Sequence, residues 1–210
     1  MINIGSKAQN GDKVGIMGGT FDPIHFGHLV TAEAARHQFQ LQQVIFIPAA
    51  RPPHKTNRRI SPPERRLAMT RLAVQSNPHF QVSDLEIARP GPSYTIDTVA
   101  EVRRKYPGAD VYFITGADAV LEILTWYRVE ELLTTCKFIA ATRPGYRLKD
   151  LTTVAGLPVK YRQNICVIEV PALAISSTDI RLRVGESRPI KYLLPEPVED
   201  YICREKLYLT

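Results

Sequence analysis

Continuous apolar runs of strand length alternate with segments of helical character along most of this chain. The runs lie at residues 14–17, 44–48, 111–114, 138–141 and 167–170. A strand with one solvent-exposed face would carry a polar residue at every second position, and these runs do not. This pattern predicts an α/β fold, namely a Rossmann-like, doubly wound parallel sheet with helices on both faces. In that architecture ligands bind at the carboxyl ends of the strands.

The segments between these runs are expected to be helices, and their first residues show where some of them begin. Ser61, followed by prolines and by Glu64, has the composition of a capping box. Ser177 is expected to cap a short helix, and Pro197 to open the last one. Residues 80–87 are interpreted as extended. The predicted helices lie at 27–39, 61–77, 95–106, 119–124, 177–184 and 197–206.

Length and composition limit the class of protein. The chain has 210 residues, of which 44% are hydrophobic and 23% charged, as in one globular domain. We expect residues 1–12 to be a flexible extension and residues 13–210 a single domain, with a C-terminal helical part from about residue 176. The segment 147–163 has the weakest pattern and is interpreted as a surface excursion. Because no apolar leader and no run of about 18 apolar residues is present, the sequence predicts a cytoplasmic protein without a membrane segment.

The formal net charge of +6 comes from one stretch of the chain. Residues 51–71 contain seven Lys and Arg residues and one acid, Glu64, whereas the rest of the chain is balanced. Such a patch attracts the phosphates of a nucleotide or of a nucleic acid. A nucleic-acid-binding module would place stacking aromatic residues among these charges, and the stretch has none, so no nucleic-acid partner is expected. Arg65 and Arg66 are interpreted as a solvated helix face.

The most informative motif is Gly-Gly-Thr-Phe-Asp-Pro-Ile-His-Phe-Gly-His at residues 18–28, between the first predicted strand and the first predicted helix. Glycines there free backbone N–H groups to face an anion, and the helix N-terminus adds the positive end of its dipole. His25 and His28 share one side of a helical turn. The dinucleotide fingerprint G-x-G-x-x-G and the P-loop motif are absent. The two histidines lack a third ligand, so we predict a polyphosphate site and no protein-bound metal.

This motif and five others in the same order resemble the nicotinate-nucleotide adenylyltransferase family, within the nucleotidylyltransferase superfamily. The resemblance covers roughly residues 14–183 and implies that 13–210 is a nucleotidylyltransferase domain. Each motif alone is weak, but six in order are specific. Thr142 stands where the family often has alanine. The other motifs are Pro-Pro-His-Lys at 52–55, Ser-Tyr-Thr at 93–95 with Asp97 and Thr98, Gly-x-Asp at 116–118 with Trp126, Thr-Arg-Pro-Gly at 142–145, and Ile-Ser-Ser-Thr-x-Ile-Arg at 175–181.

The resemblance implies an enzyme of NAD biosynthesis. It would transfer the adenylyl group of ATP to nicotinate mononucleotide, which gives nicotinate adenine dinucleotide and pyrophosphate. The nucleophile is a phosphate monoester with a second pKa of about 6, so it is mostly ionised at neutral pH and needs no general base. Catalysis then rests on positioning and on stabilisation of negative charge.

The resemblance also assigns roles to residues of the motifs. His25, His28 and Arg181 are the expected catalytic residues, and His28 is the first choice for stabilising the transition state. The nicotinate ring is expected against Trp126, although a single Trp is often a core residue. Mg²⁺ is the expected cofactor, held by phosphate oxygens and water. The expected ATP-binding residues are Gly18, Gly19, Thr20, Phe21, His25, His28, Lys55, Gly116, Asp118, Arg143, Ser177, Thr178 and Arg181, and the expected mononucleotide-binding residues are Ser93, Tyr94, Thr95, Trp126 and Tyr127.

The assignment requires two distant motifs to meet. Ser177 and Thr178, with Arg181 at helical spacing after them, are expected to form a second anion site that faces the first loop. A plain helix cap would use the same serine and threonine residues. The enzyme hypothesis therefore depends on residues 18–28 and 175–181 sharing one cavity.

Three alternatives stay open at this point. A sister nucleotidylyltransferase would act on phosphopantetheine, a polyol phosphate or nicotinamide mononucleotide. The motif at 93–95 with Trp126 argues against the first two, whereas residue types do not decide between the acid and the amide. An inactive nucleotide sensor would have the same fold, and the intact His25, His28 and Arg181 argue against it. A non-catalytic nucleic-acid-binding module is the third. The expected partners are ATP and nicotinate mononucleotide, and the sequence leaves a homo-oligomer open.

Overall fold

The computed structural model describes residues 11–52, 60–142, 157–171 and 173–209. The first ten residues, Lys55 and Arg143 lie outside the described residues, as does most of the predicted surface excursion. No helix in the described part of the chain is long and apolar enough to cross a membrane.

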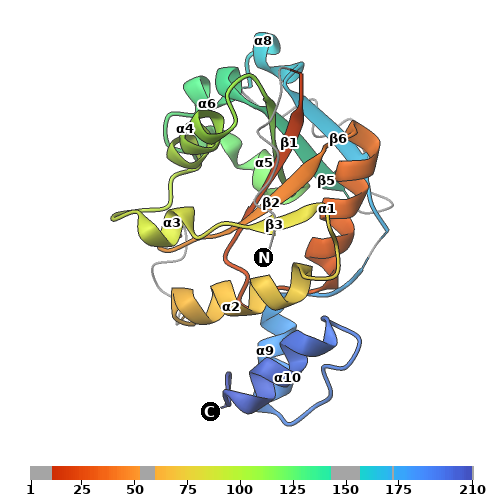
Figure 1. Ribbon diagram of the computed structural model, residues 1–210. Coiled ribbons are helices and arrows are strands. Elements are labelled where there is room, and N and C mark those ends of the chain that lie inside the picture. The colour runs from red at the N-terminus through yellow and green to blue at the C-terminus, as the bar shows by residue number, and fades with distance from the viewer. Residues whose placement is uncertain (1–10, 53–59, 143–156, 172, 210) are drawn as a thin grey trace.

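Within these residues six parallel strands form one sheet, in the order β3-β2-β1-β4-β5-β6 (Figure 1). The direction in which the sheet grows reverses between β1 and β4, which is the topological switch point of a doubly wound fold. The predicted α/β architecture is therefore confirmed. The strands are β1 (Lys13–Gly19), β2 (Gln43–Pro48), β3 (Phe80–Val82), β4 (Asp110–Gly116), β5 (Lys137–Thr142) and β6 (Ile165–Glu169).

Helices cover both faces of this sheet, and α9 and α10 lie together beside α2 at one end of the molecule (Figure 1). Two of the longer helices directly follow β1 and β2, as the right-handed crossovers of parallel strands require. The helices are α1 (Phe26–Phe39), α2 (Pro63–Val74), α3 (Leu85–Ala88), α4 (Thr95–Lys105), α5 (Ala117–Leu121), η1 (Ile123–Thr125), α6 (Val129–Thr135), α8 (Val159–Arg162), α9 (Ser177–Gly185) and α10 (Glu196–Arg204).

Strand β4 shows why the strands are continuously apolar. Val111 and Phe113 point into a buried cluster with residues of α4, α5 and α6. Tyr112 and Ile114 point to the opposite face, into a cluster with residues of α1, α2, α9 and α10. Successive side chains of a strand face opposite sides of the sheet. Because helices cover both faces, apolar residues are needed at successive positions.

Two predicted helix caps are wrong. The cap residue of α2 is Pro62 rather than Ser61, and it makes no side-chain hydrogen bond. Ser176, not Ser177, caps α9, because its backbone is extended and its Oγ accepts a hydrogen bond from the backbone N of Asp179 at 3.1 Å. Ser177 is thereby the first helical residue, and its hydroxyl is available for a contact elsewhere.

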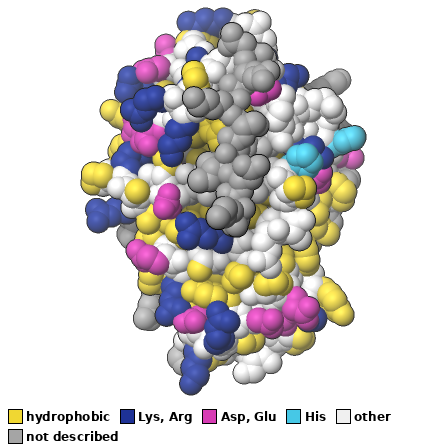
Figure 2. Space-filling view, viewed as in Figure 1, with side chains coloured by type: hydrophobic (Ala, Val, Ile, Leu, Met, Phe, Trp, Pro, Cys, Tyr) yellow, Lys and Arg dark blue, Asp and Glu magenta, His cyan; other side chains and the backbone are white. Residues whose placement is uncertain are grey.

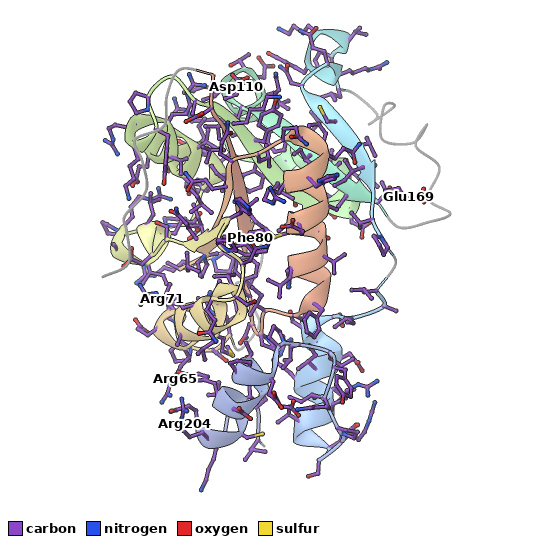
Figure 3. The ribbon with its side chains drawn as sticks, turned by 45° about the vertical axis from the view of Figure 1, so that its right-hand side comes forward. Arg65, Arg71, Phe80, Asp110, Glu169 and Arg204 are labelled. Atoms are coloured by element: carbon purple, nitrogen blue, oxygen red, sulfur yellow. The ribbon has the colours of Figure 1, made fainter. Side chains whose placement is uncertain are left out.

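Two other local predictions are also wrong. Residues 85–88 form the short helix α3 rather than an extended segment, because an apolar run of this length is compatible with either state and tertiary packing decides. Arg66 does not lie on a solvated face, since its side chain is 1% exposed. Its neighbour Arg65 contacts Tyr201 and Glu205 at the end of α10. Figure 3 labels Arg65 close to Arg204, the last residue of that helix. On the face shown in Figure 2, basic and acidic side chains of the described residues are interspersed.

Candidate active site

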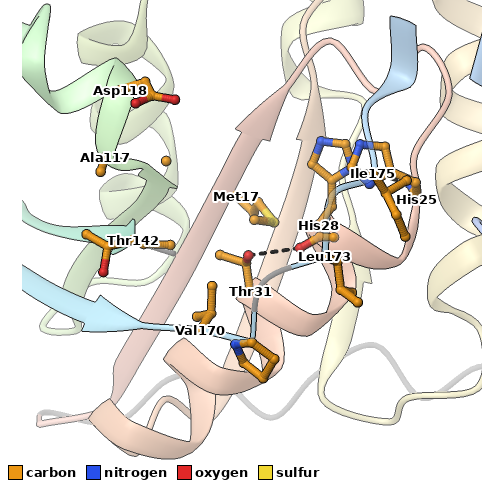
Figure 4. A pocket seen from close by; sticks show the side chains of 14 residues that line it. Met17, His25, His28, Thr31, Ala117, Asp118, Thr142, Val170, Leu173 and Ile175 are labelled. Atoms are coloured by element: carbon orange, nitrogen blue, oxygen red, sulfur yellow. Dashed lines mark hydrogen bonds between the residues drawn. The ribbon is translucent and has the colours of Figure 1, made fainter. Parts of the chain in front are cut away.

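A cavity of about 420 Å³ opens at the carboxyl ends of β1, β4 and β5, beside the first turn of α1 (Figure 4). It lies at the switch point of the sheet, where ligands of such folds bind. His25, His28, Gly116 and Asp118, all predicted site residues, line it, together with apolar side chains that follow β6. The predicted histidines and the residues after β4 therefore share one cavity.

The two histidines form a close pair at the start of α1. Their ring centroids are 3.9 Å apart. His25 is the cap residue, and its backbone N donates a hydrogen bond to Nδ1 of His28 at 3.2 Å. Because Nδ1 of His28 accepts this bond, it carries no hydrogen, and the ring N–H is on Nε2. His28 therefore carries an N–H donor in the cavity wall.

His25 is buried more deeply than its partner. Its side chain is 7% exposed, and burial lowers the pKa of its imidazole to about 4. The ring is neutral at pH 7 and contributes hydrogen-bonding capacity rather than charge. Its buried Nδ1 has no hydrogen-bond partner among the described residues. A buried polar atom in this state is rare in folded proteins.

The last two residues of β1, Gly18 and Gly19, are packed too tightly for a side chain. A Cβ atom on Gly19 would lie 2.7 Å from the ring of Phe21, and one on Gly18 would lie 2.9 Å from the ring of Phe113. Phe21 has a left-handed backbone with φ of 49°, and its buried ring meets the ring of His28 edge to face at 5.1 Å. The side chain of Phe21 thus supports His28, while backbone contacts from the loop after β1 to phosphate stay a prediction.

The late motif reaches the same loop. Ser177 Oγ donates a hydrogen bond of 2.8 Å to the carbonyl of Pro23, and Arg181 Nη1 donates one of 2.6 Å to the carbonyl of Asp22. Ile175 lines the cavity. Residues 18–28 and 175–181 are therefore in contact, but only Ile175 of the late motif lines the cavity, and Ser177, Thr178 and Arg181 are not among its lining residues. Thr178 accepts a hydrogen bond from Arg181 at 3.3 Å.

The predicted mononucleotide residues gather in a second cluster outside the cavity lining. The rings of Tyr94 and Tyr127 are stacked, with centroids 4.4 Å apart. Thr95 is the first residue of α4. Trp126 is half-buried and meets Phe113 edge to face at 5.9 Å. Phe113 also approaches Gly18, so this cluster borders the end of β1 on the face opposite α1.

Comparisons with known proteins identify the family. A cytidylyltransferase-like family matches residues 16–183. A protein of Moorella thermoacetica, named "Probable nicotinate-nucleotide adenylyltransferase", is 63% identical over 198 residues, which are 93% of this chain and 91% of the relative. The chain belongs to the nicotinate-nucleotide adenylyltransferase family. A relative of the same name from Thermoanaerobacter sp. is 56% identical over 201 residues, 93% of this chain and 94% of that protein.

Solved structures of more distant members share the fold. The nicotinic acid mononucleotide adenylyltransferase of Plasmodium falciparum, complexed with NaAD, superposes with a TM-score of 0.74 at 19% identity, over 94% of this chain and 97% of that one. Its complex with APC superposes with a TM-score of 0.72 at the same identity and coverage. At this level of identity the likeness supports the nicotinate-nucleotide adenylyltransferase fold, not individual residue roles.

Three residues at or beside this cavity are not among the predicted site residues, although two of them, Asp22 and Thr142, stand within the motifs. Thr31 lines the cavity three residues after His28, and its helical spacing from that residue was a usable signal. Thr142 lines it from the end of β5 and is 2% exposed. The carboxylate of Asp22 is buried and accepts hydrogen bonds from Ser61 and Tyr208. No local pattern marks those two partners, because they come from distant parts of the chain.

The described residues contain no group of three or more His, Cys, Asp or Glu side chains placed to hold a metal ion. Among the residues that line the cavity, the acidic side chain is Asp118. Such a lining does not form a cage of carboxylates. It suits a cation that arrives already bound to the phosphates of a nucleotide.

Proposed function

We propose that this protein transfers the adenylyl group of ATP to nicotinate mononucleotide, with the triphosphate held in the cavity beside His25 and His28. The observation that carries this proposal is the contact between the loop before α1 and the start of α9, made by Ser177 and Arg181. It brings the guanidinium of Arg181 to the same end of the sheet as the two imidazoles, while the hydroxyl of Ser177 donates its hydrogen to the loop. A cytoplasmic location is proposed with it, since both substrates are soluble metabolites.

The reaction is a displacement at the α-phosphorus of ATP. A phosphate oxygen of the mononucleotide forms the new P–O bond, and the bond from the α-phosphorus to the bridging oxygen of pyrophosphate breaks, so pyrophosphate leaves with the electron pair. The attacking phosphate is mostly ionised at pH 7, with a second pKa of about 6. The protein therefore needs no general base, and its task is to align two anions and to stabilise the charge that accumulates.

Helix α1 is suited to that task. It has 14 residues, begins beside the cavity, and carries no acidic residue in its first turn. The positive end of its dipole therefore meets the triphosphate without competition from a carboxylate of the same turn. The N–H on Nε2 of His28 is the donor proposed to stabilise the transferring phosphoryl group, and the neutral ring of His25 the donor proposed to orient it.

The remaining predicted groups complete the proposal. Arg181 would neutralise phosphate charge from the other side of the loop, and Asp118 would hold ribose hydroxyls. Mg²⁺ is proposed to enter with ATP, where it would offset charge on the phosphates and be coordinated by phosphate oxygens and water. Lys55 and Arg143 stay predicted ATP contacts outside the described residues.

The second cluster is proposed to bind the pyridine nucleotide. The nicotinate ring would lie against Trp126, and its carboxylate near the backbone N–H of Thr95 at the start of α4. The backbone N–H groups of a first helical turn have no partner within the helix, and the helix dipole there favours an anion over a neutral amide. This arrangement supports a preference for the acid over nicotinamide mononucleotide.

An assay of pyrophosphate release tests the function and the acid preference together. Purified protein with ATP and Mg²⁺ is given nicotinate mononucleotide or nicotinamide mononucleotide at equal concentrations. We expect release to be much faster with the acid. Equal rates would overturn the acid preference, and no release with either substrate would overturn the adenylyl transfer itself.

The variant His28→Asn tests the role of that ring. Asparagine keeps an acceptor for the backbone N of His25 but removes the Nε2 donor, so we expect kcat to fall by roughly 10²–10³ with the fold intact. His37→Asn changes an exposed histidine of the same helix and should retain the wild-type rate. A nearly normal kcat for His28→Asn would remove His28 from the mechanism.

A further inference from the structure

Arg66, near the start of α2, is the largest fully buried side chain among the described residues, at 1% exposed. Burial of a charge is costly unless hydrogen bonds compensate. Its guanidinium faces four backbone carbonyls: Nη1 donates to Thr20 at 2.8 Å and to Ala49 at 2.6 Å, Nε to Ser61 at 2.9 Å, and Nη2 to Ala50 at 3.4 Å. One side chain thus joins the loop after β1, the segment after β2 and Ser61, two residues before α2.

The segment after β2 has a second anchor at its other side. Ser93 Oγ accepts hydrogen bonds from the backbone N of Ala50 at 3.0 Å and of Arg51 at 3.2 Å, and the backbone N of Ser93 donates to the carbonyl of Arg51 at 3.1 Å. Residues 49–51 are therefore held between Arg66 and the Ser-Tyr-Thr motif. The other end of the connection is Thr20, in the loop proposed to bind ATP.

We infer that Arg66 is a positioning residue for adenylyl transfer, which sets the spacing between the ATP loop at Thr20 and the mononucleotide motif at Ser93 through residues 49–51. The inference rests on the proposed function. Arg66 touches neither substrate in this role. The reaction joins a phosphate from each substrate, so an error in the spacing of the two sites acts directly on the rate.

The chemistry of the side chain supports arginine specifically. A guanidinium presents donors in fixed, coplanar directions, which lets one group hold carbonyls of separate segments. A lysine ammonium keeps the charge but cannot reproduce this fork. If Arg66 only filled the core, a variant that folds would work normally.

Arg66→Lys tests the inference, with Arg71→Lys as the matched control on an exposed position of the same helix. Rates are compared per folded molecule, at a temperature where circular dichroism shows each variant folded. We expect Arg66→Lys to lower kcat at least tenfold and to raise KM for both ATP and nicotinate mononucleotide, and Arg71→Lys to match the wild type. Unchanged constants, or a change in KM for one substrate alone, would overturn the inference.

Ser93→Ala tests the same connection from its other end and keeps the inference open to refutation if Arg66→Lys does not fold. The change removes the hydroxyl that holds residues 49–51, so we expect KM for ATP to rise as well as KM for the mononucleotide. A rise confined to the mononucleotide would overturn the connection. An inactive wild type would count against the proposed function, and this inference would fail with it, whereas an active wild type with unaffected variants would count against Arg66 alone.

Discussion

The phenol of Tyr208 donates a hydrogen bond of 2.7 Å to Oδ1 of Asp22, although the two residues are 186 positions apart. The other carboxylate oxygen accepts a hydrogen bond from the backbone N of Ser61 at 3.1 Å, and the carbonyl of Asp22 accepts one from Arg181 at 2.6 Å. The loop that leads into α1 is therefore held by the segment that precedes α2, by α9 and by the segment that follows α10.

Tyr208→Phe should destabilise this loop. The change takes a donor from a carboxylate that is 4% exposed, and the loss of a hydrogen bond to a buried charged group costs about 1–3 kcal/mol. Urea denaturation should show that decrease in the free energy of unfolding, and kcat should fall because Arg181 is held by the same residue. Tyr192→Phe, at a tyrosine that is 82% exposed, is the control and should change neither. Equal stability of the two variants would show that the bond to Asp22 contributes nothing.

The sheet could be predicted from the sequence because it follows from local pattern. Each strand of the core has apolar residues at successive positions, and the pattern of two covered faces leads directly to a doubly wound sheet. The motif at residues 18–28 likewise lies between a strand and a helix, where the structure places it. These features depend on neighbours in the chain, which a sequence shows.

Contacts between distant segments could not be predicted in this way. Arg66 stands beside Arg65 in a polar run, a pattern that predicts a solvated side chain, but the carbonyls that it binds belong to residues up to 46 positions away. Ser176 and Ser177 are adjacent and chemically identical, and the fold alone decides that the first caps α9 and the second reaches Pro23. In both cases the hydrogen-bond partners were set by the fold rather than by the residue type.

The stability of the protein should depend on pH through His25. Burial lowers the pKa of its imidazole from 6.5 to about 4, so between these values the unfolded chain binds a proton that the folded chain resists. The free energy of unfolding therefore has its full value, as far as His25 is concerned, above pH 6.5. It falls by up to about 3 kcal/mol in all as the pH decreases from 6.5 toward 4. Urea denaturation across this range should give a smaller pH slope for His25→Asn than for the wild type.

His37→Asn controls for the substitution itself. His37 lies on the same helix and is exposed, so its replacement should leave the free energy of unfolding at neutral pH close to that of the wild type. If His25→Asn also kept the full slope, the loss of stability on acidification would have to come from other groups.

Gly27→Ala should disturb the histidine pair from within α1. A Cβ atom at this position would lie 3.0 Å from Cε1 and from Nδ1 of His25, so the imidazole must shift by a few tenths of an ångström. We expect kcat to fall roughly three- to tenfold, since misplacement by about 1 Å can cost a factor of 100. An NMR titration should show an altered pKa of His25. Gly116→Ala also adds a methyl group to the cavity wall, but it meets no atom within 4 Å and should leave that pKa unchanged.

Trp126→Ala separates binding from packing at the second cluster. The indole is half-buried and packs edge to face against Phe113 at 5.9 Å and Phe138 at 6.1 Å, so its loss should lower the free energy of unfolding by about 1–3 kcal/mol, less than for a fully buried Trp. If the nicotinate ring lies against it, KM for nicotinate mononucleotide should rise more than KM for ATP. Trp126→Phe should recover part of both effects, because an aromatic face is kept. Reduced stability with both KM values unchanged would make Trp126 a core residue and move the nicotinate ring to another surface, of which the stacked pair Tyr94 and Tyr127 is the nearest aromatic candidate in the same cluster.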